Sequence, residues 1–448
     1  MGEKLSESIG AFAGWVWGIP LIVLLFGTHL FLTVRTGFIQ KRIWQGIRLS
    51  LRKEKGADGD VSPFASLMTA LAATIGTGNI IGVATAITMG GPGAVLWMWL
   101  TGVFGIATKY AEAILSVKYR VKNDRGEMCG GPMYVLEHGL GMKWAGVLFA
   151  ALTAIAGFGI GNMNQSNAVV SQVAGWMPHV DKGTLGLVLG LVMSGLTAAV
   201  VLGGVKSVSR VCSVLVPVMA LVYVGGCVAI LIMNAAELPA AFSTIVEGAF
   251  NFESLAGGFT GSALAAAMRF GIARGLFSNE SGLGSAPIVA AAAQSRNPMR
   301  QALVSATGTF WDTVVVCALT GLVLVSSGHW KEGLKNTELT QAAFADLHTF
   351  GPAILLFALI TFVFSTIIGW CYYGEKAVEY LFGRRAVMPY RVMWVVFVFV
   401  GANSQLETVW NFSDAANGLM AIPNLVSLLL LSGLIARETR EHQGDLGE

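Results

Sequence analysis

Charged residues are scarce in this chain of 448 residues, since only 12% of the positions are Asp, Glu, Lys or Arg and 54% are hydrophobic. Soluble globular proteins carry about 25% charged residues. The composition therefore excludes an ordinary soluble domain and indicates a protein that lies in a lipid bilayer. The formal net charge of +3 is too small to indicate binding of nucleic acid.

Motifs of metal sites and nucleophiles are also missing. The five cysteines form no Cys-x-x-Cys pair and have no nearby histidines, and the six histidines form no His-Glu-x-x-His pattern. Neither a zinc site nor a disulfide framework nor a common metal hydrolase is indicated. The first residues lack a basic region that leads directly into a short apolar core, so we expect no cleavable signal. Without a catalytic cluster, we expect a protein that is not an enzyme.

Glycines are abundant, and one glycine-rich run, AATIGTGNIIG from Ala72 to Gly82, resembles a nucleotide-binding turn at first sight. A dinucleotide-binding turn needs glycines at its first, third and sixth positions, a preceding strand and an acidic residue about 20 residues further on. Here the sixth position is Ile81, no strand pattern precedes the run, and no acidic residue follows at that distance. The run must serve another purpose.

Long apolar segments account for most of the chain. A hydrocarbon core about 30 Å thick takes about 20 apolar residues per helix, and the run from Glu237 to Asn251 is too short and polar to cross, so we expect an interfacial helix there. The run from Gly328 to Phe350 is expected to be an external loop. Eleven segments meet the length criterion, near residues 13–34, 62–90, 93–117, 144–173, 184–204, 208–233, 259–293, 301–327, 351–381, 388–404 and 409–436.

The distribution of lysine and arginine predicts the orientation. The loop after the first segment carries seven basic residues between Arg35 and Lys55 and should be cytoplasmic. With alternating loops, 22 of the 29 basic residues fall on that side, four fall on the other and three lie within segments. We therefore expect a multi-pass protein of the prokaryotic cell (inner) membrane, with its amino terminus outside and its carboxyl terminus in the cytoplasm.

Without the first segment, ten remain, and they divide into five plus five. The first member of each half contains glycine interruptions, IGTGNIIG in one and RFGIARGLFSNESGLGSAP in the other. Interrupted helices at corresponding positions of two halves are typical of transporters built from inverted repeats, with the substrate bound at the breaks. The glycines at 282 and 284 also fit simple close packing of helices. At 76 and 78, the backbone N–H groups of a half-helix start would suit a carboxylate.

This division predicts an all-α integral membrane protein with about 11 transmembrane helices and two broken core helices. The first part holds the extracellular terminus, an extra helix and a basic loop, and the last is a cytoplasmic tail. Two five-helix repeats flank an interfacial segment. The predicted parts are residues 1–61, 62–234, 235–258, 259–436 and 437–448.

Two longer motifs resemble a known family. GGPGAVLWMWLTGVFG, from Gly90 to Gly105, and GIARGLFSNESGLGSAP, from Gly271 to Pro287, are similar to the two hallmarks of the alanine or glycine:cation symporters, also called sodium:alanine symporters. Leu96 departs from that pattern, which usually has an aromatic residue there. The resemblance implies a LeuT-like fold and sodium-driven uptake of alanine or glycine, with a sodium ion bound during transport and membrane lipid around the protein.

The resemblance also implies a substrate site at the two breaks. The amides of Thr77 and Gly78 would hold the substrate carboxylate, and Asn79 would support the first break. Carbonyls of the second break, expected at Gly271–Gly275 and including Ile272, would face the substrate ammonium. Gln165 is the candidate side chain for that ammonium, although an interhelical hydrogen bond would equally explain it.

The same resemblance implies a sodium site of oxygen ligands. In LeuT-like folds, carbonyls of the first broken helix and two adjacent hydroxyls of the eighth core helix hold one sodium ion. Serine and threonine in membrane helices also commonly bond to their own helix. Trp370, one turn beyond the hydroxyls, would wall a pocket suited to a small side chain, or would anchor the helix at the membrane surface. The sodium ligands implied are Ala72, Ile75, Phe362, Ser365 and Thr366.

Ionisable residues within membrane segments are costly and are therefore candidates for function. Lys109 and Glu112 lie three residues apart, so we expect them to pair. Arg274, Glu280 and Asp312 are expected to brace or gate the second broken helix, or to form a buried salt-bridge network. Asp312 could instead carry a proton, which would make the protein a proton-coupled carrier. A sensor or channel on the same scaffold is a further alternative, and the oligomeric state stays open.

Overall fold

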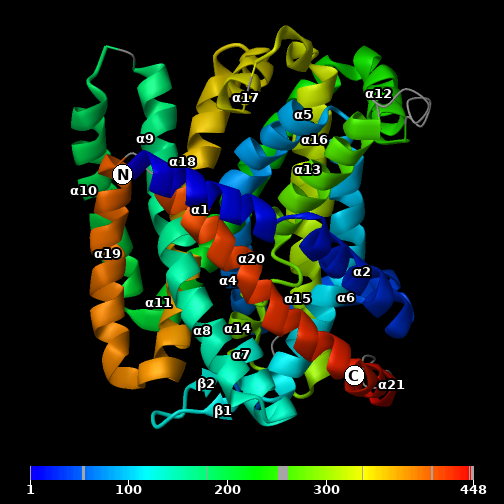
Figure 1. Ribbon diagram of the computed structural model, residues 1–448, viewed down its shortest axis with the longest axis vertical. Coiled ribbons are helices and arrows are strands. Elements are labelled where there is room, and N and C mark those ends of the chain that lie inside the picture. Colours follow the sequence, from blue (N-terminus) through cyan, green and yellow to red (C-terminus); the bar gives the residue numbers. More distant parts are fainter. Residues whose placement is uncertain are drawn as a thin grey trace.

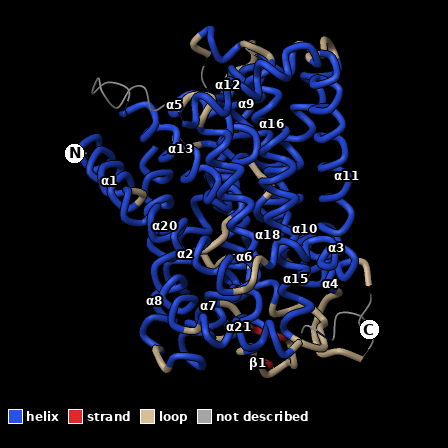
Figure 2. The backbone as a smooth tube through the Cα atoms, turned by 90° about the vertical axis from the view of Figure 1, so that its right-hand side faces the viewer, coloured by secondary structure: helices blue, strands red, loops and turns tan. Residues whose placement is uncertain are grey.

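Helices make up almost the whole molecule in this computed structural model, which describes residues 2–52, 56–177, 179–250, 261–334, 336–404, 407–442 and 444. The longer helices run roughly along one common direction, as Figures 1 and 2 show. Short helices cover one end of the bundle, and a two-stranded hairpin lies at the other end, together with the carboxyl-terminal helix (Figure 1). A bundle of this kind is the arrangement that the apolar segments predict.

The first half of the chain contains the amino-terminal helices, the first broken helix and four long helices. A short antiparallel hairpin pairs Val121 with Cys129 and Lys122 with Met128. The elements are α1 (Gly2–Val16), α2 (Ile19–Arg35), η1 (Ile39–Arg42), α3 (Ile43–Ser50), α4 (Pro63–Thr74), η2 (Gly78–Gly82), α5 (Val83–Gly90), α6 (Ala94–Lys118), β1 (Val121–Lys122), β2 (Met128–Cys129), α7 (Pro132–Tyr134), η3 (Val135–Gly139), α8 (Lys143–Phe158), η4 (Gly159–Met163), α9 (Asn164–Trp176), α10 (Lys182–Val201) and α11 (Gly204–Met233).

The second half has a similar order of short and long helices. Its longest helix has 33 residues. The elements are η5 (Ala235–Glu237), α12 (Leu238–Phe250), α13 (Gly261–Asn279), α14 (Pro287–Ala290), α15 (Pro298–Thr309), η7 (Phe310–Cys317), α16 (Ala318–Ser326), η8 (His329–Glu332), α17 (Asn336–Ala345), α18 (Phe350–Phe382), η9 (Arg384–Ala386), α19 (Val387–Asn403), α20 (Glu407–Leu430) and α21 (Ser432–Glu441).

The helix starts follow from local chemistry. Ser62 caps α4 by accepting the N–H of Ala65 at 3.2 Å, and Pro63 occupies the first turn, where a missing N–H costs nothing. Asn297 and Pro298 start α15 in the same way, with the Asn297 side chain accepting from Arg300 N at 3.0 Å. The two capped helices, α4 and α15, pack against each other.

The membrane spans agree with the sequence in part. Among the described residues, seven helices are long and apolar enough to cross a membrane, or nine if each of two bent pairs is one span. The predicted spans near 93–117 and 259–293 correspond to α6 and to α13 with α14, which are not among these nine. The expected count of eleven therefore stays a prediction, as do the five-plus-five division and the orientation. Residues 53–55 of the basic loop and 259–260 lie outside the described residues.

Two predicted spans are bent rather than straight. The chain turns by 55° between α4 and the helix from Gly78 to Gly90, and by 59° between α20 and α21. The last predicted span therefore ends at Leu431, and α21 extends through residues expected to form a tail. Lys118 at the end of α6 holds α21 through an ion pair with Glu438 at 2.5 Å.

The core of the bundle is built where α6, α13 and α15 pack together and where α18 packs against α4, α8 and α11. All five cysteines are free and buried. Between these two groups lie the breaks in the helices, so the non-helical backbone is enclosed by protein, which is the condition for such backbone at membrane depth.

Candidate functional site between the two broken helices

The first break lies at Ile75–Thr77, between α4 and η2. Ile75 leaves the helical region with ψ 96°, and the Asn79 side-chain oxygen accepts the N–H of Gly76 at 2.9 Å. This bond satisfies a backbone donor that the interrupted helix leaves without a helical partner. Asn79 thus supports the break, as its position in the sequence indicated.

The second break runs from Glu280 to Ala286, between α13 and α14. Gly282 and Gly284 have φ of +89° and +87°, a conformation that glycine adopts without strain. Their N–H groups both donate to Oε1 of Glu112 on α6, each at 3.0 Å. The two glycines therefore allow the turn itself, and the packing explanation for them was incomplete.

The expected position of this second break, Gly271–Gly275, was wrong. Those residues lie inside the continuous helix α13. A Cβ on Gly271 would lie 2.3 Å from the carbonyl oxygen of Ala94, and one on Gly275 would lie 3.1 Å from Thr101 Cβ. The two glycines let α13 approach α6 closely, as small residues do in membrane helix pairs.

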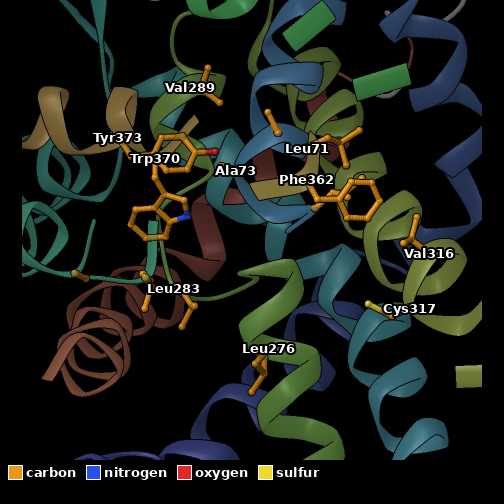
Figure 3. Close-up of a cluster of buried hydrophobic side chains, with 14 of the residues drawn as sticks. Leu71, Ala73, Leu276, Leu283, Val289, Val316, Cys317, Phe362, Trp370 and Tyr373 are labelled. Atoms are coloured by element: carbon orange, nitrogen blue, oxygen red, sulfur yellow. The ribbon is translucent and has the colours of Figure 1, made fainter. Parts of the chain in front are cut away.

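A small cavity of about 20 Å³ lies between the first break and α18. That space suits about one water molecule, so the site is nearly closed in this conformation. Figure 3 shows the surrounding core, with Trp370 and Tyr373 beside Ala73. Gly271 and Ile272 do not line the cavity, which is bounded by Ala73, Thr74, Gly76, Thr77, Gly78, Ile160, Gln165, Phe277, Glu280, Thr366 and Trp370.

Two of the predicted substrate residues, Gln165 and Trp370, line this cavity and have side chains held by hydrogen bonds. Gln165 donates from Nε2 to the carbonyl of Ile160 at 2.9 Å, while its buried Oε1 has no hydrogen-bond partner among the described residues. The indole N–H of Trp370 donates to Oε1 of Glu280 at 2.9 Å. Trp370 is 1% exposed and lies deep in the protein, which argues against a surface anchor.

The predicted sodium ligands come together beside the same break. The hydroxyls of Ser365 and Thr366 both lie 2.9 Å from the carbonyl of Phe362, and the Thr366 hydroxyl is 3.4 Å from the carbonyl of Ile75. Ala72 is fully buried on α4. Thr366 therefore bridges α18 and the broken helix, whereas the Ser365 hydroxyl is bonded within its own helix.

Asp312 joins the two broken helices through side chains. Its carboxylate accepts from Asn79 Nδ2 at 2.7 Å, from the Ser278 hydroxyl at 2.9 Å and from the Thr313 hydroxyl at 2.7 Å. Arg274 lies with its guanidinium 5.8 Å from the ring centre of Phe277, a cavity-lining residue. These contacts fit bracing of the site.

The expected pairing of Lys109 with Glu112 was wrong. Glu112 turns toward the second break and also accepts from Asn424 Nδ2 at 2.7 Å. Lys109 is 3% exposed, and its Nζ has neither a hydrogen-bond partner nor an ion pair within the described part of the chain. Helical spacing alone pointed to a pair, but the unwound backbone offers the carboxylate better donors, which only the folded arrangement reveals.

Comparison with known proteins decides the family. The family model for the sodium:alanine symporter family matches residues 2–447. The chain belongs to the sodium:alanine symporter family. The resemblance predicted from Gly90–Gly105 and Gly271–Pro287 is thereby confirmed, and this protein is a transporter rather than an enzyme.

Relatives of this sodium:alanine symporter cover almost its full length. The sodium/alanine symporter AgcS of Methanococcus maripaludis is 50% identical over 98% of this chain and 96% of its own. An uncharacterised transporter of Haemophilus influenzae is 47% identical over 98% of this chain and 96% of its own. Membership in this family makes the protein a multi-pass, cation-coupled amino-acid transporter.

Solved structures confirm the LeuT-like fold. MhsT in complex with L-phenylalanine superposes with a TM-score of 0.56 at 15% sequence identity, covering 86% of this chain and 99% of that one. At this identity the likeness concerns the fold alone.

A second, larger cavity of about 830 Å³ opens in this sodium:alanine symporter near the hairpin. Trp370 and Glu375 on α18 are five residues apart, or about 7.5 Å along the helix axis, so this opening ends close to the small cavity. Arg391 forms two bonds with Glu375, at 2.6 and 3.0 Å. The charged lining residues are Asp60, Arg125, Glu127, Lys206, Glu375, Lys376, Glu379, Arg384, Arg385 and Arg391.

Proposed function

We propose that this transporter couples the movement of sodium into the cell to the uptake of a small neutral amino acid, alanine or glycine, by alternating access. The observation that carries the proposal is the position of the Thr366 hydroxyl, which lies 3.4 Å from the carbonyl of Ile75 and also lines the small cavity. A sodium ion bound there would touch the same broken helix that holds the substrate.

Several features support a small substrate. The substrate carboxylate would bind at Thr77 and Gly78, with Asn79 supporting the break, and the Trp370 ring would limit the side-chain space. The cavity volume of about 20 Å³ must increase for any amino acid to enter, so a large side chain would require a larger rearrangement. The opening of about 830 Å³ near the hairpin would be the release path.

The sodium site would consist of carbonyl and hydroxyl oxygens of Ala72, Ile75, Phe362, Ser365 and Thr366. Such hard oxygen ligands suit an alkali cation, since no carboxylate is needed to balance a single positive charge in the presence of the substrate carboxylate. Because Thr366 touches both helices and Ser365 bonds only within α18, we assign Thr366 the larger contribution.

The purified protein in proteoliposomes tests the proposal. An inward sodium gradient should drive accumulation of labelled alanine, replacement of sodium by choline should remove it, and unlabelled alanine inside should exchange with labelled alanine outside. Thr366→Ala should raise the sodium concentration needed for half-maximal uptake more than Ser365→Ala does, with Thr366→Ser as the control that keeps the hydroxyl. Equal sodium requirements in all four proteins would contradict the site.

A proton-coupled carrier is the second candidate, and the buried carboxylates of Glu280 and Asp312, at 4% and 0% exposure, favour it. Uptake driven by a pH gradient without sodium would establish this mechanism instead. A sensor or channel on the same scaffold would fail to exchange internal for external alanine.

A further inference from the structure

The small cavity is lined by one ionisable side chain, the carboxylate of Glu280. Its Oε1 accepts the indole N–H of Trp370 at 2.9 Å, and its Oε2 accepts the hydroxyl of Ser285. A carboxylate has about four acceptor positions. Both oxygens can therefore accept further donors from a molecule in the cavity while they hold these two partners.

The backbone at Glu280 is unusual for a glutamate. Its φ is +55°, and it directly follows α13, at the position where helices most often end with glycine. Gly282 and Gly284 in the same break meet the same conformational demand without a side chain. Glutamate at 280 is therefore not explained by the turn, and its position directs a carboxylate toward the first break.

Among the described residues, no lysine, arginine or histidine forms an ion pair with this carboxylate. Lys109 interacts electrostatically with Glu112, Glu280 and Asp312, but it forms no ion pair or hydrogen bond within the described part of the chain. One lysine thus faces three buried carboxylates. A cation bound beside the Glu280 carboxylate would stabilise its charged form, because Coulomb interactions are strong where water is excluded.

A second acceptor faces the same cavity. The buried Oε1 of Gln165 accepts no hydrogen bond from the part of the chain that the structure describes, and the amide orientation is fixed because Nε2 donates to the carbonyl of Ile160. This oxygen lies close to the first break, since a Cβ on Gly76 would be 3.7 Å from it. A buried acceptor without a partner is costly, and an ammonium group would supply N–H donors to both Gln165 and Glu280.

We propose that Glu280 is the counter-ion of the substrate ammonium, with Gln165 Oε1 as the second acceptor. The site would then select zwitterionic amino acids over 2-hydroxy acids of the same size, and the carboxylate would hold the Trp370 ring in place at the same time. The inference rests on the proposed function, because it assigns the ammonium end of the same substrate.

Two ligands of one carbon skeleton test it. Alanine carries an ammonium and lactate carries a hydroxyl at the same carbon, so their affinities for the purified full-length protein at saturating sodium isolate the ammonium contact. In the wild type, alanine should bind and lactate should bind at least about 30-fold more weakly, the factor expected for a close charge pair that is lost. Glu280→Gln should lower the affinity for alanine by a similar factor and leave the affinity for lactate within about 3-fold of the wild-type value.

Trp370→Phe is the matched control, because it removes the indole donor and leaves the carboxylate. Because Trp370 lines the pocket, any loss of affinity in this variant should be equal for alanine and lactate, so the preference for alanine should remain. Glu280→Asp keeps the charge and should also keep the preference. If Glu280→Gln does not fold, as judged by gel filtration and thermal unfolding, the comparison of alanine with lactate in the wild type remains the test.

The outcomes separate this inference from the proposed function. Unchanged alanine affinity in Glu280→Gln, or an equal loss for both ligands, would overturn the inference and make Glu280 a residue that only positions Trp370. Comparable binding of lactate and alanine to the wild type would overturn it as well. A wild type that binds neither ligand would overturn the proposed function, and the inference with it.

Discussion

At the scale of the residue, Gly76 lies in the first break directly against Thr366. A Cβ added to Gly76 would lie 2.6 Å from the Thr366 hydroxyl, which is closer than side-chain carbons approach. The hydroxyl is also the group that we propose as a sodium ligand. The absence of a side chain at 76 thus leaves this hydroxyl beside the first break.

Gly76→Ala should therefore weaken sodium binding more than it lowers the stability of the fold. The added methyl group pushes the Thr366 hydroxyl away from the Ile75 carbonyl, so we expect the sodium concentration for half-maximal alanine uptake to rise roughly 10-fold, which corresponds to about 1.4 kcal/mol. Uptake in proteoliposomes as a function of sodium measures this shift.

Gly82→Ala is the matched control in the same broken helix, because the nearest atom to a new Cβ there is the Thr77 carbonyl oxygen at 4.0 Å. Its sodium requirement should stay near the wild-type value. If both variants behave alike, the contact between Gly76 and Thr366 does not matter for sodium.

At the scale of the element, Glu112 ties three segments together. Its Oε1 accepts from the backbone of Gly282 and Gly284 in the second break and from Asn424 on α20. The carboxylate replaces helical carbonyls as the acceptor for the unwound backbone, so α6, the break and α20 share one buried hydrogen-bonded centre.

Glu112→Ala should leave three buried donors without a partner. Each lost partner costs about 1–3 kcal/mol, and we expect a loss of about 3 kcal/mol or more in the free energy of unfolding, seen as a lower thermal unfolding temperature in detergent. Glu112→Gln keeps an amide oxygen at the same place and should retain most of the stability. Equal losses in the two variants would show that the charge of Glu112, rather than its acceptor, stabilises the break.

The two breaks differ in how well the sequence predicts them. In the first, Thr77 and Asn79 accompany the glycines, and polar residues beside glycine in an apolar segment indicate interruption. In the second, glycine occurs both at 271 and 275 and at 282 and 284, and the sequence does not distinguish close packing on α6 from a left-handed turn. The distinction depends on Glu112, which is some 170 residues away in the chain.

The connection between α16 and α17 contains a pH-sensitive group outside the spans. The Asp346 carboxylate, 3.0 Å from His329 Nε2, and then Glu332, 2.9 Å from Nδ1, raise the pKa of His329 above its usual value. A group whose pKa is raised on folding stabilises the fold fully below its unfolded pKa and loses that contribution as the pH rises through the folded pKa.

We therefore expect the connection to loosen as the pH rises above about 6.5, the ordinary pKa of histidine. Backbone amide exchange in α17, corrected for the intrinsic pH dependence, should accelerate roughly a few-fold between pH 6 and 8.5. This factor corresponds to the small stabilisation that exposed ion pairs contribute. His329→Gln should remove this pH dependence, and a change that persists in the variant would assign it to another group.

At the scale of the whole molecule, the proposed sodium and substrate sites share the first broken helix. Ligands that order the same backbone must favour each other, and the coupling is equal in both directions. Sodium should raise alanine affinity by roughly 5- to 150-fold, and alanine should raise sodium affinity by the same factor. Calorimetric titration of each ligand with and without the other measures both factors, and unequal factors or no coupling would contradict the shared helix.

The sequence predicts the class, the family and most helices of the molecule, because apolar length and long motifs are local properties. Through the resemblance, it also places the Thr366 hydroxyl beside the first break, where the structure has it 3.4 Å from the carbonyl of Ile75. It does not predict Glu280 at the cavity or the bend before α21, because these depend on which partner a side chain meets after folding. The sequence likewise suggested Lys109 as the partner of Glu112, because the backbone donors of Gly282 and Gly284 come near Glu112 only after folding.

The burial of all five cysteines makes the natural protein convenient for spectroscopy. A thiol introduced at an exposed site would be the accessible one for maleimide dyes or spin labels, so no cysteine-free background has to be engineered first. Met388, which is 51% exposed at the rim of the larger opening, is a suitable place for such a label. A second label on α12 would then report, by distance, how the two ends of the bundle move during a transport cycle.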